Sequence, residues 1–119
     1  MIEEIIDGIK YSLDEDNMTA EVIRYDYVGD IKIPETIQFN ELTYRVESIG
    51  NSAFEGCEYL TSIVIPDSVT SIGEYAFYGC EKLTSITIPD SLTSIGEDAF
   101  RGCESLTSIN GITFINGIQ

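Results

Sequence analysis

Residues 49–71 read IGNSAFEGCEYLTSIVIPDSVTS, and residues 72–94 read IGEYAFYGCEKLTSITIPDSLTS. A third, shorter copy, IGEDAFRGCESLTSI, follows directly at residues 95–109. The copies keep the same order of Ile-Gly, Ala-Phe, Gly-Cys and Leu-Thr-Ser-Ile at a period of 23 residues. A fixed period of roughly 20 to 50 residues is typical of a stacked array rather than of a single globular core. We therefore expect a repeat protein, in which binding uses a surface made by several units.

Each unit contains a segment with the pattern of a short β-strand. In LTSIVIP, which ends at Pro66, Ile63 and Ile65 lie two positions apart and share one face of a strand, whereas Val64 points the other way. The proline ends the strand because it cannot donate to a β-ladder. The apolar spacing fits the L-x-x-L-x-L core of a leucine-rich repeat. These units predict a β-rich α/β solenoid, a right-handed superhelix with its short strands on the concave face and an N-terminal β-hairpin cap.

The chain is expected to form a single domain with four parts. The cap hairpin is predicted from alternating segments on both sides of a turn at residues 14–17. A disguised first coil precedes the clear repeats, because Ile33 and the proline after it match Ile65 and its proline. These two isoleucines are 32 residues apart, nine more than the period, which predicts a hairpin insertion in the first coil. In order, the parts are the N-terminal cap hairpin, the first coil with its insertion, the 23-residue repeats, and a terminal strand or truncated repeat: residues 1–27, 28–48, 49–109 and 110–119.

The formal charge of −15 is large for 119 residues and is spread along the whole chain. Residues 1–48 hold 12 acids against 4 bases, and residues 49–119 hold 9 against 2. A dispersed acidic surface argues against nucleic acid and anionic lipid as partners, because both need clustered Lys and Arg. The sequence has no apolar run of roughly 18 residues that would span a membrane. Its first residues also lack the basic flank and apolar stretch of a signal peptide.

No combination of residues predicts catalysis. The sequence contains no His, so it has no ordinary Ser-His or Cys-His pair, and no glycine-rich phosphate motif occurs. The three cysteines recur at the repeat period: Cys57, Cys80 and Cys103. Stacked side chains at one position of successive coils point the same way, so we interpret them as a buried ladder rather than as a disulfide or zinc site. Acids that recur in the same manner are interpreted as a solvated face. We therefore expect no enzyme, no cofactor and no metal site.

The outward-facing residues of the strands are the best candidates for binding. In a solenoid, extended ligands lie along such a face. The strip is small, polar and nearly uncharged, and its Thr and Ser residues are also common on exposed strands for reasons unrelated to binding. Three tyrosines elsewhere on the coil, Tyr59, Tyr75 and Tyr78, predict a second, aromatic patch. The candidate binding strip comprises Lys32, Thr61, Ser62, Val64, Thr84, Ser85, Thr87, Thr107, Ser108 and Asn110.

The three units, together with the lead-in YSLDEDNMTAEV at residues 11–22, resemble BspA-like leucine-rich repeats. The resemblance covers about residues 9–109 and is specific, because several residue types coincide at fixed offsets in consecutive units. It implies a solenoid used for adhesion or protein binding, typical of bacterial surface or secreted proteins and also found in some protists.

From the repeat surface and this resemblance we expect a non-enzymatic binding or adhesion module of a bacterial cell-surface or secreted protein. Its ligand would be a protein or a glycan. Two other functions also fit the sequence. One is a structural or assembly module that self-associates, as a homodimer through residues 110–119, because this apolar end has the character of an edge strand. The other is an intracellular scaffold in the cytoplasm.

Overall fold

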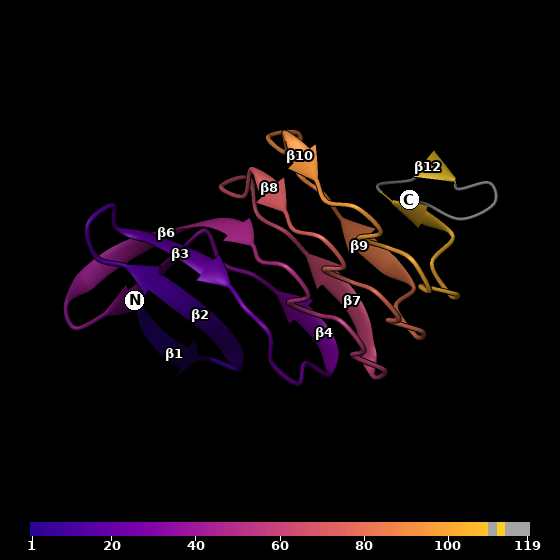
Figure 1. Cartoon of the computed structure of the whole chain (residues 1–119), viewed down its shortest axis with the longest axis horizontal. Coiled ribbons are helices and arrows are strands. Elements are labelled where there is room, and N and C mark those ends of the chain that lie inside the picture. Colours follow the sequence, from indigo (N-terminus) through magenta and orange to yellow (C-terminus); the bar gives the residue numbers. More distant parts are fainter. Residues whose placement is uncertain (110–111, 114–119) are drawn as a thin grey trace.

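The computed structural model describes residues 1–109 and 112–113, and these residues form two β-sheets. The strands follow one another along the longest axis, from the N-terminal strands at one end to β12 at the other (Figure 1). The larger sheet has seven strands: β1 (Ile2–Ile6), β2 (Ile9–Asp14), β3 (Thr19–Val22), β5 (Thr36–Phe39), β6 (Leu42–Ile49), β8 (Ser71–Ile72) and β10 (Ser94–Ile95). The smaller sheet has five: β4 (Gly29–Lys32), β7 (Leu60–Val64), β9 (Ser85–Thr87), β11 (Ser108–Ile109) and β12 (Ile112–Thr113).

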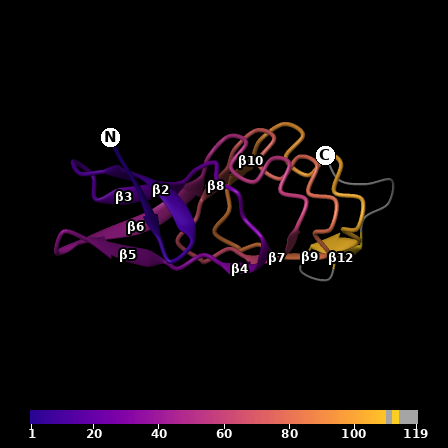
Figure 2. The same cartoon turned by 90° about the horizontal axis from the view of Figure 1, so that it is seen from below.

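Successive units pair in parallel and in register, as a stacked repeat requires. In the smaller sheet Ile63 lies beside Ile86, and Ile86 lies beside Ile109. In the larger sheet Ile49 lies beside Ile72, and Ile72 lies beside Ile95. Each of these steps is 23 residues, so every unit contributes one strand to each sheet. Figure 2 shows β4, β7, β9 and β12 along one side of the coils and β8 and β10 along the opposite side.

The N-terminal cap is larger than the expected hairpin. β2 and β3 are antiparallel, and β1 adds a third antiparallel strand on the outer side of β2. Strand β1 was not predicted from the sequence. The signal for it is the dipeptide Asp7-Gly8, whose φ angles of 50° and 84° suit the two-residue turn that joins β1 to β2. β3 then pairs in parallel with β6, so the cap continues the larger sheet of the repeats. The insertion in the first coil forms the antiparallel pair β5–β6.

The helical contribution expected from an α/β solenoid is not found in residues 1–109 and 112–113. The Ala-Phe segments form turns instead, in which the amides of Ala53 and Cys57 donate to the carbonyls of Gly50 and Phe54. Other amides of these turns bond to the next coil, for example Phe54 N to Ala76 O at 2.7 Å. The turn backbone is thus shared between coils and cannot also make a helix's own hydrogen bonds. The handedness of the superhelix and the concavity of the strand face stay predictions.

The interior contains a column of stacked aromatic rings. The ring centroids of Phe54 and Phe77 are 4.9 Å apart at 12°, and those of Phe77 and Phe100 are 5.4 Å apart at 6°. The three cysteines are free thiols beside this column. The thiols of Cys80 and Cys103 each donate to the carbonyl of the phenylalanine one coil earlier, at 3.0 Å. The thiols therefore pack in the core and make hydrogen bonds between coils.

The Ile-Gly pair of the second unit has glycine because neighbouring coils approach closely at this position. Gly73 does not have the left-handed backbone; a Cβ there would overlap the backbone amide of Asn51 in the preceding coil. The left-handed glycines are those of the Gly-Cys pairs, such as Gly79 with φ of 74°. Close approach of coils, rather than turn geometry, thus requires glycine at position 73.

The C-terminal part departs from the repeat. β12 pairs with β11 in antiparallel fashion, with Ile109 opposite Ile112, and forms one edge of the smaller sheet. Asn110 and the proposed homodimer segment at residues 110–119 lie outside the described residues, apart from the two residues of β12. Ile95 is 45% exposed, because β10 is the last strand of the larger sheet.

Candidate binding surface

Three residues of the predicted strip form a column across the smaller sheet. Lys32 lies beside Val64 on the neighbouring strand, and Val64 lies beside Thr87 on the next. All three side chains are exposed, including the apolar Val64 at 38%. They line a hollow of about 580 Å³, whose other walls include Pro34 and Pro66 at the strand ends. The structure thus places one charged, one apolar and one hydroxyl group in a groove that crosses three coils.

The Thr and Ser residues of the strip make hydrogen bonds within the fold. Thr61 and Ser62 donate their hydroxyls to Oδ1 of Asp30, at 2.8 and 2.7 Å. The hydrogen bonds from Ser62 and then Thr61 hold the pKa of the Asp30 carboxyl below its usual value. Asp30 was not among the predicted site residues. Its signal is the alignment of the first coil, which places it beside Ser62 in the ladder.

The remaining residues of the strip lie on later coils. Thr84 donates its hydroxyl to the carbonyl of Thr61 at 3.2 Å, so this side chain also joins two coils. Ser85 lies beside Ser62 on β9 and is exposed, and Thr107 is exposed just before β11. Ser108 is the first residue of β11. The strip therefore comprises neighbouring rows of the stack, and some of its hydroxyls hold the coils together.

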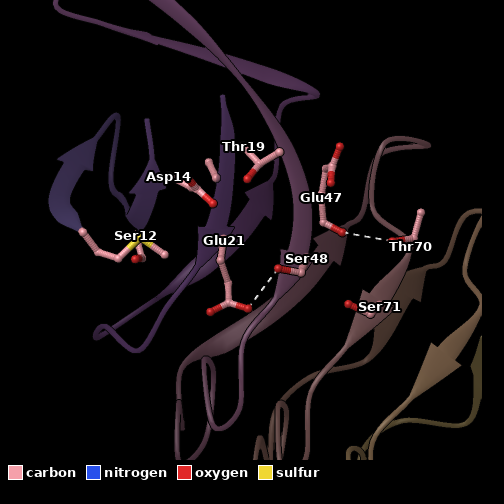
Figure 3. Close-up of a pocket in the computed structure, with 10 residues that line it drawn as sticks. Ser12, Asp14, Thr19, Glu21, Glu47, Ser48, Thr70 and Ser71 are labelled. Atoms are coloured by element: carbon pink, nitrogen blue, oxygen red, sulfur yellow. Dashed lines mark hydrogen bonds between the residues drawn. The ribbon is translucent and has the colours of Figure 1, made fainter. Parts of the chain in front are cut away.

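The larger sheet presents a second polar face that the sequence analysis did not single out. Figure 3 shows a pocket on this face, of about 270 Å³, in which hydroxyls and carboxylates of the cap, β6 and β8 come together. The signal for it is the second Thr-Ser pair of each full unit, Thr70-Ser71 in the first. Thr93 donates to the carbonyl of Thr70 at 3.0 Å, which repeats the arrangement of Thr84 on the other sheet.

The carboxylates around this pocket already have partners. Asp14 accepts hydrogen bonds from Asn17, whose side-chain amide lies at 2.9 Å, and these bonds lower the pKa of the Asp14 carboxyl. Glu21 accepts from the Ser48 hydroxyl at 2.9 Å (Figure 3). Glu47 lies 3.7 Å from the Arg45 guanidinium. Among the described residues, no group of three or more His, Cys, Asp and Glu is arranged to hold a metal ion.

The thiols of Cys57 and Cys80 have the environment of core residues rather than of nucleophiles. Cys57 and Cys80 are buried, and burial raises the pKa of the Cys57 thiol. A protonated, enclosed thiol is a poor nucleophile. Residues 1–109 and 112–113 also contain no helix long and apolar enough to cross a membrane.

Parallel 23-residue units, an apolar ladder inside and short strands outside define a leucine-rich-repeat protein. Residues 29–119 match the model of the BspA type leucine-rich repeat region, and the chain belongs to this family. The match begins at Gly29, so it includes the first coil, in which the motif is disguised. Proteins of this family are generally non-enzymatic interaction modules.

Solved structures of bacterial repeat proteins are similar to the chain. A leucine-rich repeat protein from Bacteroides ovatus is 40% identical over 89% of this chain, with a TM-score of 0.83. A leucine rich cell surface protein from Faecalibacterium prausnitzii is 35% identical over 90%, with a TM-score of 0.77. The leucine-rich repeat protein of T. pallidum is 34% identical over 93%, also with a TM-score of 0.77. The chain covers 28%, 30% and 50% of these three proteins, respectively. No curated protein sequence matches the chain.

Proposed function

We propose that the chain is a non-enzymatic protein-binding module that holds an extended segment of its partner in the groove of the smaller sheet. The groove is defined by Lys32, Val64 and Thr87 with the flanking Pro34 and Pro66. Cell-surface localisation and an adhesive role are part of the proposal, supported by the similarity to the cell surface protein of F. prausnitzii.

The observation that carries the proposal is the in-register column of unlike side chains. Lys32 supplies a positive charge, Val64 an exposed apolar contact and Thr87 a hydroxyl, each one coil further along the groove. A partner that crosses the coils would meet these three chemistries in a fixed order. Carboxylates at the rim, those of Glu35 and Asp67, add hydrogen-bond acceptors. A mixed, ordered surface of this kind favours a protein segment over a uniform polymer.

An array of immobilised extracellular matrix proteins and glycans tests the proposal. The labelled chain is applied beside the variant Val64→Gln, which replaces exposed methyl groups in the groove by an amide. The matched control is Val28→Gln, because Val28 is 62% exposed and does not line the groove. We expect a protein spot that the parent and Val28→Gln bind equally and that Val64→Gln binds roughly tenfold more weakly. Glycan binding alone, or equal binding by all three forms, contradicts the proposal.

A second candidate function is assembly through the C-terminal end. β12 forms one edge of the smaller sheet, and an edge strand is able to pair with another chain. Light scattering of the chain with and without residues 110–119 tests this candidate. A monomer in both forms contradicts self-association.

A further inference from the structure

Comparison of the units with one another separates structural positions from variable ones. The Thr-Ser pairs of β7 and β9 are identical in each unit, and Thr61 and Thr84 make hydrogen bonds inside the stack. The turn that follows each Ile-Gly pair, in contrast, contains positions that vary from unit to unit. Around its fixed Ala-Phe and Gly-Cys residues, the fourth position is Ser52, Tyr75 or Asp98, and the seventh is Glu55, Tyr78 or Arg101. Positions that core packing does not constrain can vary between units and can therefore carry residues that bind a partner.

The middle unit places two tyrosines together on this turn. The rings of Tyr75 and Tyr78 pack edge to face, with centroids 5.6 Å apart at 67°. Their side chains are 36% and 37% exposed. Together with Glu55 and Arg101 from the neighbouring units they line a hollow of about 450 Å³. We call these four residues the tyrosine patch.

The backbone conformation of Tyr75 is one in which a bulky side chain is unexpected. Its φ is 57°, in the left-handed region that a bulky side chain rarely adopts. The equivalent residues Ser52 and Asp98 have the same backbone, at 58° and 55°, but carry small polar side chains. Residues in such conformations are over-represented at ligand-binding sites, where the surrounding structure holds them in place.

The charges around the patch favour a cation. Residues 51–59, 74–82 and 97–105, which contain the three turns, hold seven acids against two bases. Arg101 lies 3.6 Å from Asp98, which offsets its charge. The ammonium of Lys82 lies 5.1 Å from the ring centroid of Tyr59 on the same part of the coil. The molecule thus already pairs one exposed tyrosine with an ammonium, the interaction that a bound lysine would make.

We propose that the tyrosine patch binds a basic segment of a partner protein, with a Lys or Arg side chain stacked on Tyr75 and Tyr78 and its charge beside the Glu55 carboxylate. The aliphatic part of the bound side chain would cover the rings, and the surrounding acids would attract the segment. The patch and the groove share no residue, so the two proposals fail independently.

Fluorescence anisotropy with a labelled, end-capped peptide of four Lys-Gly-Ser repeats tests the patch. Because the chain carries a charge of −15, any polycation will be attracted, so the tyrosine variants keep the net charge and the two glutamate variants are compared with each other at equal charge. In 150 mM salt we expect Tyr75→Ser/Tyr78→Ser to bind the peptide about tenfold more weakly than the parent. Tyr59→Ser, whose ring already contacts Lys82, is the matched control and should bind nearly as the parent does. Glu55→Gln should weaken binding more than Glu58→Gln, which removes the same charge outside the patch.

Equal affinity of the parent and the double variant overturns the proposal, and so does equal loss in the Tyr59→Ser control. Tyrosine-dependent binding of a neutral oligosaccharide without binding of the peptide would also overturn it, in favour of a glycan site. The double variant should fold, because serine at position 75 matches the natural Ser52 of the preceding unit. A thermal melt by circular dichroism, at or near the parental midpoint, confirms that the comparison is between folded proteins.

Discussion

The ring centroid of Tyr27 lies 4.4 Å from that of Phe54, at an interplanar angle of 34°. Tyr27 therefore begins the aromatic column that Phe54 and Phe77 continue, although its segment does not carry the Ala-Phe motif. Its phenol is held in the cap by two hydrogen bonds. It donates to the carbonyl of Ile23 at 2.7 Å and accepts from the amide of Lys10 at 3.2 Å. The cap is thus joined to the repeats through the core as well as through the pairing of β3 with β6.

Replacing Tyr27 should alter the response of the fold to alkali. Burial raises the pKa of Tyr27 from 10.0 to about 12, so its phenol stays protonated in the folded chain where the unfolded chain ionises. This contribution to stability is complete below pH 10 and is lost as the pH rises from 10 to 12. Tyr27→Phe should lower the free energy of unfolding at pH 7 by about 1–2 kcal/mol, because its hydrogen bonds are lost. Above pH 10 the free energy of unfolding of the variant should fall less steeply with pH than that of the parent. Denaturant titrations between pH 7 and pH 12 measure the effect, with Tyr25→Phe as the exposed control. If the free energy of unfolding of Tyr27→Phe falls with pH as steeply as that of the parent, the raised pKa does not belong to Tyr27.

Ser68 and Ser91 occupy the same position in successive units but should respond in opposite ways to alanine. Ser91 donates to the carbonyl of Val69 at 3.0 Å. The hydroxyl of Ser68 is buried and has no hydrogen-bond partner among the described residues. Removing an unpaired buried hydroxyl is neutral or stabilising, whereas removing a bonded one costs about 1 kcal/mol. Urea unfolding of Ser68→Ala and Ser91→Ala checks this, and equal destabilisation of the two variants would contradict it.

Gly73→Ala should destabilise the stack more than Gly50→Ala does. A Cβ at Gly73 would overlap the backbone of Asn51, which cannot move without shifting the whole coil. At Gly50 the nearest atom is the flexible Glu21 carboxylate, at 3.0 Å. We expect a cost of about 1–3 kcal/mol for Gly73→Ala, typical of overpacking, and a smaller one for Gly50→Ala. Thermal melts of the two variants measure the difference, and the reverse order would show that the close approach of coils is not what requires glycine.

The Asp30 carboxylate should titrate below its usual pKa of 3.8, because it accepts the hydroxyls of Ser62 and Thr61. A lowered pKa means that these bonds stabilise the fold above pH 3.8 and that their contribution is lost as the pH falls through the folded pKa. Carbon-detected NMR of the Asp30 side chain in the parent and in Thr61→Val/Ser62→Ala gives the value directly. The double variant should move it back toward 3.8. An unchanged titration would mean that the hydroxyls do not bind Asp30 in solution.

The repeat itself was predictable because its physical requirements recur. Ile63 and Ile86 occupy the same place in successive units, so the period alone gives the parallel register that the structure shows. The helical part of the predicted α/β class is not found in the described residues, and the sequence around Ala53 and Phe54 does not reveal that their amides bond partly to the next coil. Which hydrogen bonds a turn makes depends on its neighbour, and not only on its own residues.

Residues outside the period were harder to assign. Strand β1 reads IEEII, which does not alternate strictly, and only the Asp7-Gly8 turn indicates it. Tyr27 has no equivalent at the repeat spacing, so its place in the aromatic column depends on how the cap docks. Asp30 and Thr61 are 31 residues apart, because the insertion lies between them. Their contact therefore cannot be predicted from the 23-residue period alone.

The dissociation constant of the tightest protein partner found on the array, measured for three forms of the chain, tests the central claim most directly. The forms are the parent, Val64→Gln in the groove and the exposed control Val28→Gln. The proposed function predicts that the parent and Val28→Gln share one value, and that the value for Val64→Gln is about tenfold higher. A single value for all three forms, with the fold of each intact, would contradict binding through the groove.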